Sequence, residues 1–146
     1  MELNISEEIL QRIEHSIAQA EKNTSAEIRV HMEDECADSA LDRAAYVFKA
    51  LEMHKTAQRN GVLIYLDTTN RKAAIIGDKG IHEKVGTKYW QDILNRMLAH
   101  FKSGGFSEGL EEAISAVGQQ LSRYFPIQTD DTNELSNKVT HAQDIH

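Results

Sequence analysis

A continuous apolar run in the middle of the chain restricts the fold more than any other feature of the sequence. It covers 61–66, Gly-Val-Leu-Ile-Tyr-Leu, and no charged residue interrupts it. A run of this length and composition is typical of a strand at the centre of a sheet, where other elements cover both faces. The segment therefore predicts a sheet that is covered by helices on both sides.

A second strand is expected directly after the first. Residues 67–71, Asp-Thr-Thr-Asn-Arg, are typical of a turn, and 73–76, Ala-Ala-Ile-Ile, are apolar again. Because so short a connection leaves no room for a crossover, the two strands should pair as an antiparallel hairpin.

An earlier strand is predicted at 26–33, where apolar and polar residues alternate with a period of two. One face would carry Ala26, Ile28, Val30 and Met32, and the other Glu27, Arg29, His31 and Glu33. We expect this strand to be half-buried, with its polar face towards water. A helix that begins after Asp38 or Ser39 separates it from 61–66, so these two strands should run parallel through a right-handed crossover.

Helical spacing of apolar residues marks the remaining segments. One helix should begin at Ser6, and another should follow Thr87. A third should begin after Gly104-Gly105 and end at Pro126, the only proline of the chain. Together the elements predict an α/β fold in which a small mixed β-sheet, made of a βαβ unit plus an antiparallel hairpin, is sandwiched between α-helices.

The chain should form a single folded domain. A length of 146 residues is ordinary for one domain with its own core. We place this domain at residues 1–126. Residues 127–146 are polar and aperiodic, and we expect them to be a flexible C-terminal tail.

Composition argues against several classes of function. The formal net charge of −7 argues against a nucleic-acid binder, which normally carries a basic stripe. A single cysteine, Cys36, excludes an internal disulfide. No stretch approaches the roughly 20 apolar residues of a membrane span, and the first residues lack the basic and apolar regions of a secretory signal. We expect a cytoplasmic protein that neither inserts into membranes nor binds nucleic acid.

Three polar segments that are far apart in the sequence should meet at one edge of the sheet, which we name the rim: 23–27, 54–60 and 77–80. Parallel strands begin at the same edge, and the third strand runs back to it. Carboxylate and amide oxygens are ligands that Ca²⁺ prefers. The predicted ligands of a divalent cation are therefore Asp78, Glu27 and Asn60.

The rim also carries groups that suit an anion. Lys55, Arg59 and Lys79 are cationic. Gly77 and Gly80 bracket a tight turn before a helix, and the backbone N–H groups of such a turn can bind phosphate. These five residues are candidates for binding a phosphorylated small molecule.

A rival acidic group is expected at the opposite edge of the sheet. Glu33, Asp34 and Glu35 follow one strand and Asp67 ends the next, so a cation can be held there instead. Asp78 also has a structural interpretation, as the residue that caps the following helix. Both alternatives stay open.

The rim segments resemble the TPM domain family, in its short bacterial type. The likeness rests on Asn-Thr-Ser-Ala-Glu-Ile-Arg-Val-His at 23–31, His-Lys-Thr at 54–56, Arg-Asn-Gly-Val-Leu-Ile-Tyr at 59–65 and Gly-Asp-Lys-Gly-Ile at 77–81. It extends from Ser6 to about Pro126. The resemblance implies an α/β sandwich around a small mixed sheet.

The resemblance implies three kinds of activity. Some members are associated with Ca²⁺ binding, which implies a cation at the Asp78 rim. One is associated with an acid-phosphatase activity, which implies a metal-dependent phosphatase. Others resemble non-catalytic modules, which implies an adaptor that recognises another protein. Many members carry a signal peptide and a membrane helix, which we do not find here, and Ala26 stands where relatives often have glycine.

Overall fold

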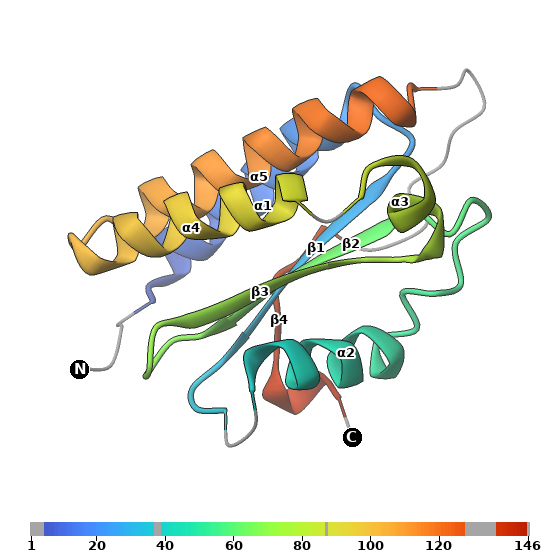
Figure 1. The fold of residues 1–146 in the computed structure, drawn as a ribbon. Coiled ribbons are helices and arrows are strands. Elements are labelled where there is room, and N and C mark those ends of the chain that lie inside the picture. Colours follow the sequence, from blue (N-terminus) through green and yellow to red (C-terminus); the bar gives the residue numbers. More distant parts are fainter. Residues whose placement is uncertain (1–4, 37–38, 87, 128–136, 146) are drawn as a thin grey trace.

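The computed structural model describes residues 5–36, 39–86, 88–127 and 137–145. In this part of the chain a mixed four-stranded sheet lies in the middle, with helices on both of its faces (Figure 1). The predicted α/β fold, a small mixed sheet sandwiched between α-helices, is confirmed.

Three strands form the part of the sheet that the sequence predicted. β1 (Glu27–Glu33) and β2 (Gly61–Asp67) run parallel. β3 (Lys72–Gly77) returns antiparallel to β2, so both the βαβ unit and the hairpin are present. Every residue of β2 is buried, as expected for a central strand.

Three long helices cover one face of the sheet: α1 (Glu7–Glu21), α4 (Lys88–Lys102) and α5 (Phe106–Tyr124). Ser6 caps α1, because its hydroxyl accepts a hydrogen bond from the N–H of Ile9 at 3.2 Å. The apolar stripes of these helices pack on the sheet and form the larger of two core clusters.

Of the α-helices that the structure describes, α2 (Ala40–Ala50) covers the opposite face. Ser39 caps it by accepting the N–H of Asp42 at 3.1 Å. Val47 of this helix packs with Leu63 of β2 in the second, smaller core cluster. No helix within the described residues is long and apolar enough to cross a membrane.

The polar face of β1 is buried, so the prediction that it faces water is wrong. All seven residues of this strand are buried. Its polar side chains bond with neighbours instead of solvent; the His31 ring nitrogen Nε2, for example, lies 3.1 Å from Glu33 Oε2. Alternation reveals that a strand has a polar face, but not that another element covers that face.

The end of the chain is part of the sheet, so the prediction of a flexible tail is wrong for residues 137–145. β4 (Thr140–His141) pairs in parallel with β1 and completes the strand order β3-β2-β1-β4. A 3₁₀ turn, η1 (Ala142–Asp144), follows it. A strand of two residues has no periodicity that could predict it. Residues 128–136 of the predicted tail lie outside the described residues.

Candidate functional site

The rim forms at the edge where β1 and β2 begin and β3 ends (Figure 1). Glu27 lies opposite Gly61 in the parallel ladder. The N–H of Asp78 donates to Gly61 O at 2.9 Å, one position beyond the last pair of the hairpin. The predicted topology therefore brings the three polar segments together.

Asp78 is bound on both of its carboxylate oxygens. They accept hydrogen bonds from the Arg59 guanidinium, at 2.7 Å from Nε and 2.8 Å from Nη2. Oδ1 also accepts the N–H of Lys79 at 2.8 Å, which caps the short helix α3 (Lys79–Lys84). Burial alone would raise the pKa of the Asp78 carboxyl, but these hydrogen bonds hold its pKa below the ordinary value. The capping interpretation of Asp78 is confirmed.

Arg59 is held at the rim by its backbone. Its φ of 51° lies in the left-handed region. Its carbonyl accepts the N–H of Gly80 at 2.9 Å, and a Cβ at Gly80 would collide with the carbonyl oxygens of Gln58 and Arg59. Because the N–H groups of Lys79 and Gly80 bond within the protein, the turn does not offer them to an anion. The Arg59 side chain itself is 47% exposed.

Glu27 and Asp78 flank Gly61 on one face of the sheet. Residues opposite one another in register point to the same side, and here that is the side covered by α2. Neighbouring strands lie about 4.8 Å apart, so the two Cα atoms are about 10 Å apart. Gly61 puts no side chain between the two carboxylates.

Asn60 is 1% exposed and has a polar atom without a partner. Its carbonyl accepts the N–H of Glu27 at 3.3 Å, and its Nδ2 donates to Ser25 O at 3.3 Å. No described residue donates to its Oδ1. A buried amide oxygen without a hydrogen-bond donor destabilises the fold by about 1–3 kcal/mol. A donor or a cation that binds this oxygen would remove that penalty.

Glu21, the last residue of α1, is a rim residue that the sequence analysis missed. Its Oε2 accepts the N–H of Ile28 at 2.7 Å, on the part of β1 that β4 does not reach. Burial raises the pKa of the Glu21 carboxyl to about 8, and the neighbouring Glu27 carboxyl adds to the shift. No sequence pattern signals this contact, because it depends on where α1 ends above the strand.

The remaining cations of the rim do not converge on Asp78. Lys55 Nζ bonds to Glu52 Oε1 at 3.1 Å, and both side chains are more than half exposed. Lys79 is exposed at the start of α3. His54 also contributes to the lowered pKa of Asp78, by less than the hydrogen bonds from Arg59 and from the Lys79 N–H. Arg59 is thus the predicted cation that contacts Asp78 directly.

At the rival edge, Glu33 is bound by protein donors. Arg43 Nε and the Tyr65 hydroxyl each lie 2.8 Å from Oε1, while Arg43 Nη2 lies 2.7 Å and His31 Nε2 3.1 Å from Oε2. Burial would raise the pKa of Glu33, but these partners lower it to about 2. Thr140 of β4 contacts the other nitrogen of His31 at 2.7 Å. Apart from Arg43, which is partly exposed, the network is buried, and it is bonded internally, which indicates a structural role.

The other acidic residues of that edge do not complete a cation site. Asp67 accepts hydrogen bonds from the backbone N–H groups of Cys36, Thr69 and Asn70 at 3.0–3.1 Å. Asp34 and Glu35 are exposed. Within the described residues, no group of three or more His, Cys, Asp or Glu side chains is arranged to hold a metal ion.

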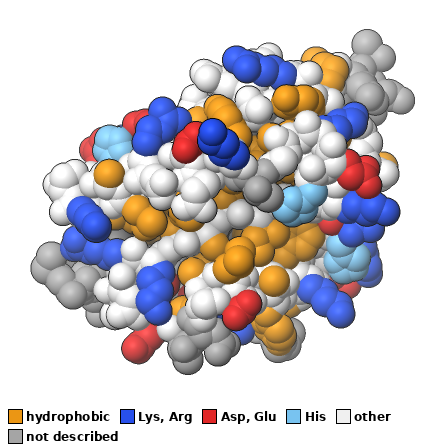
Figure 2. All heavy atoms as spheres, in the orientation of Figure 1, with side chains coloured by type: hydrophobic (Ala, Val, Ile, Leu, Met, Phe, Trp, Pro, Cys, Tyr) orange, Lys and Arg blue, Asp and Glu red, His pale blue; other side chains and the backbone are white. Residues whose placement is uncertain are grey.

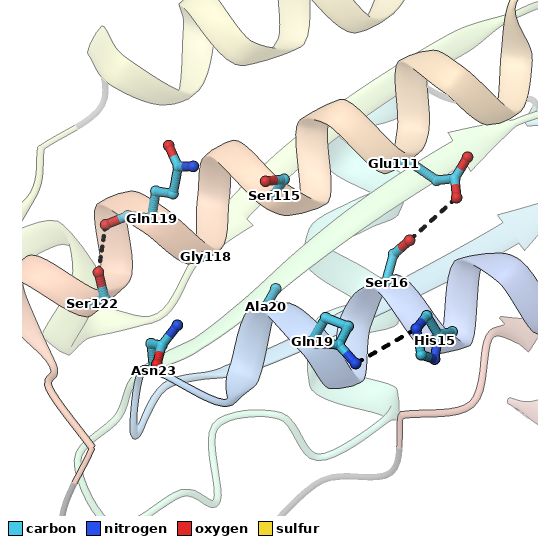
Figure 3. A pocket seen from close by; sticks show the side chains of 10 residues that line it. All are labelled: His15, Ser16, Gln19, Ala20, Asn23, Glu111, Ser115, Gly118, Gln119 and Ser122. Atoms are coloured by element: carbon cyan, nitrogen blue, oxygen red, sulfur yellow. Dashed lines mark hydrogen bonds between the residues drawn. The ribbon is translucent and has the colours of Figure 1, made fainter.

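A polar hollow of about 300 Å³ lies between α1 and α5, where the sequence predicted no site (Figure 3). Its side chains bond mainly to one another: Ser16 donates to Glu111 at 3.4 Å, and Gln19 lies 3.5 Å from His15. Asn23, at its end, is the one member that belongs to the rim segments. The hollow has neither the buried carboxylates nor the unbonded oxygen of the rim.

A family model described as the TPM domain matches residues 4–120. No curated protein is similar enough to the chain to count as a match.

Two solved structures share the fold. The BA42 protein of the psychrophilic bacterium Bizionia argentinensis, solved by NMR, is 39% identical, with a TM-score of 0.89 over 97% of this chain and 98% of that one. The N-terminal domain of a P. gingivalis protein is 22% identical, with a TM-score of 0.65 over 82% of this chain and 78% of that one. The second likeness concerns the fold alone.

Proposed function

The chain belongs to the TPM domain family, and from this premise we propose that its rim binds a divalent cation, Ca²⁺, through Asp78, Glu27 and Asn60. The observation that carries the proposal is the buried Oδ1 of Asn60, which has no donor among the described residues. The two carboxylates on either side of Gly61 supply the negative charge that a hard cation needs.

The Arg59 guanidinium bonds to both carboxylate oxygens of Asp78. Binding of Ca²⁺ to this carboxylate therefore exchanges the guanidinium for the ion. The guanidinium neutralises Asp78 and is 47% exposed, so it can leave towards water without crossing the core. An incoming cation takes its place as the counter-charge. Because the carboxylate is already ionised, no proton has to be released from Asp78 at neutral pH.

The affinity should be low. Ca²⁺ takes roughly six to eight oxygen ligands, and three side chains leave several positions to backbone carbonyls and water. The ion also competes with an internal cation. We expect a dissociation constant of about 10⁻⁴–10⁻³ M, the range of weakly binding calcium modules.

Titration of ¹⁵N-labelled protein with CaCl₂ tests the proposal. The amide signals of 59–61 and 77–80 should shift along a saturable curve, and Asp78→Asn should remove these shifts. Asp34→Asn is the matched control, because it removes an exposed carboxylate at the opposite edge and should leave the titration unchanged. Rim signals that stay still up to about 10 mM Ca²⁺, or that shift equally in Asp78→Asn, contradict the proposal.

A metal-dependent phosphatase is the second candidate, and one observation favours it. The Arg59 guanidinium bonds to Asp78 and is 47% exposed, so once the ion has displaced it, it can bind the oxygens of a phosphorylated small molecule. Among the described rim residues, no nucleophile hydrogen-bonds to a general base, so the ion itself would have to activate water. Cation binding therefore comes first, and hydrolysis depends on it.

Hydrolysis of an aryl phosphate, measured with added Ca²⁺ and with EDTA, tests this candidate. Turnover should require the ion and should disappear in Asp78→Asn. Activity that persists in both EDTA and Asp78→Asn belongs to a contaminant and contradicts the assignment.

A further inference from the structure

Within the part of the chain that the structure describes, β3 is the last strand on its side of the sheet, and no other strand pairs with its outer edge. Along an antiparallel ladder, residues alternately bond to the partner strand and point away from it. The N–H of Asp78 bonds to β2, so the backbone N–H and C=O groups of Ile76 and Ala74 also point towards β2. The backbone groups of Ala73 and Ile75 point away from β2, towards the outer edge. No described residue hydrogen-bonds to the backbone groups of Ala73 or Ile75 on that outer edge.

An apolar groove of about 570 Å³ runs along this open edge. α2 supplies one wall through Leu41 and Ala45, and α4 supplies the other through Trp90 and Leu94. Figure 2 shows the result as a band of hydrophobic side chains across the middle of this face, between the two helix layers. An extended segment laid along β3 would direct alternate side chains to one wall and then to the other.

The groove exposes apolar surface beside an edge strand, where native proteins normally shield such surface. Leu41 is 61% exposed, although it lies next to the open strand. Native edge strands are usually shielded by a charge within the strand, by proline or by a covering element. In β3 the only charged residue is Lys72, at its first position. This edge has the features that strand addition requires: free backbone groups and side-chain pockets on both sides.

The charges around the groove indicate the chemistry of the partner. Lys72 begins β3, Lys79 follows its end, and both are exposed. Exposed His82 lines the groove, and Asp42 is its one acidic lining residue among those described. This basic border stands out in a chain with a net charge of −7.

We propose that the open edge of β3 binds an extended apolar segment of another protein, flanked by acidic residues, which adds as a fifth strand. The outward backbone groups of Ala73 and Ile75 give the pairing, the groove walls take the apolar side chains, and the lysines at the ends of β3 meet the acidic flanks. This surface lies on the opposite side of β3 from β2 and does not use the proposed cation ligands.

The probe is the capped peptide Glu-Asp-Val-Ile-Val-Leu-Asp-Glu, added to the full chain. Trp90 is the only tryptophan of the chain and lines the groove, so its fluorescence should report binding. Hydrogen exchange at the amides of Ala73 and Ile75 should slow by about tenfold or more, because those N–H groups gain acceptors. The same peptide with lysine flanks, or with N-methyl groups on its inner amides, should bind about tenfold more weakly.

Two groove variants and a matched control locate the site. Leu41→Glu places a charge on one wall, and Ile75→Pro removes an outward donor that does not bond to β2, so each should weaken binding about tenfold. Ile127→Glu adds the same charge at an exposed apolar residue outside the groove and should bind as the parent does.

Several results overturn the proposal. One is the absence of any change in Trp90 emission and in exchange at Ala73 and Ile75 at up to about 1 mM peptide. Another is equal binding by the parent and both groove variants, which puts the peptide elsewhere. Protection of the two amides that grows with protein concentration without peptide makes the edge a surface for a second copy, which also refutes the proposed partner.

Discussion

At the scale of single residues, Arg59 controls whether Asp78 is available to a ligand. Its guanidinium bonds to both carboxylate oxygens, so an added cation has to compete with it. Arg59→Gln removes the competitor and should tighten Ca²⁺ binding about fivefold, as expected when a partly exposed ion pair no longer opposes the ion. Calorimetric or NMR titration of the variant measures the change.

Lys55→Gln is the control for this prediction. It removes the same charge from the same loop, but Lys55 pairs with Glu52 and not with Asp78. Its effect on Ca²⁺ affinity should stay below about twofold, because exposed charges are screened. Equal tightening in both variants would mean that only the net charge of the rim matters.

Glu21 should give the fold an uncommon dependence on pH. Burial raises its pKa to about 8 from the ordinary 4.5, with the Glu27 carboxyl adding to the shift. A carboxyl whose pKa is higher in the folded state stabilises the fold while it is protonated; this contribution is complete below 4.5 and is lost as pH rises through 8. The free energy of unfolding should therefore fall by on the order of 2 kcal/mol between about pH 5 and pH 8.

Urea unfolding at the two pH values measures this slope. Glu21→Gln keeps an oxygen that can accept the N–H of Ile28 but cannot titrate, so its slope should be flatter. Glu8→Gln, at an exposed position of the same helix, should unfold with the parent slope. A slope that survives in Glu21→Gln belongs to another group.

At the scale of elements, the contact between α1 and α5 depends on Gly118. A Cβ there would lie 2.8 Å from the Cβ and 3.1 Å from the carbonyl oxygen of Ala20. Gly118→Val must therefore push the helices apart and should destabilise the protein by about 1–3 kcal/mol in urea unfolding. Ser115→Val adds the same β-branched side chain one turn earlier at an exposed position and should cost less than about 1 kcal/mol.

Elements could be predicted from the sequence wherever their apolar pattern repeats several times. β2 is seven residues long and fully buried, and α4 carries a sustained apolar stripe, so both were predictable from periodicity. β4 was not, because two residues carry no period and their pairing depends on the open edge of β1. The polar face of β1 was misassigned for a related reason: the elements that cover it lie elsewhere in the chain.

At the scale of the whole molecule, the location of the rim could be predicted, but its bonding could not. Strand directions alone bring 23–27, 54–60 and 77–80 to one edge, since they follow from connection lengths and handedness. The pairing of Arg59 with Asp78 and the unbonded Asn60 Oδ1 depend on side-chain positions of a few ångströms. Sequence patterns specify which segments meet, whereas packing decides which atoms bond.

That assembly makes cation binding a property of the folded chain as a whole. The three proposed ligands come from segments that meet only when the sheet has formed, so the unfolded chain should bind Ca²⁺ far more weakly. A ligand that binds only the folded state stabilises it by RT ln(1 + [L]/Kd), which is about 2 kcal/mol at a roughly thirtyfold excess over the dissociation constant. Urea unfolding at increasing CaCl₂ should show this rise, with no rise for Asp78→Asn and the full rise for Asp34→Asn. Equal stabilisation of the parent and Asp78→Asn would mean that the ion acts elsewhere on the fold, whatever its effect on the rim.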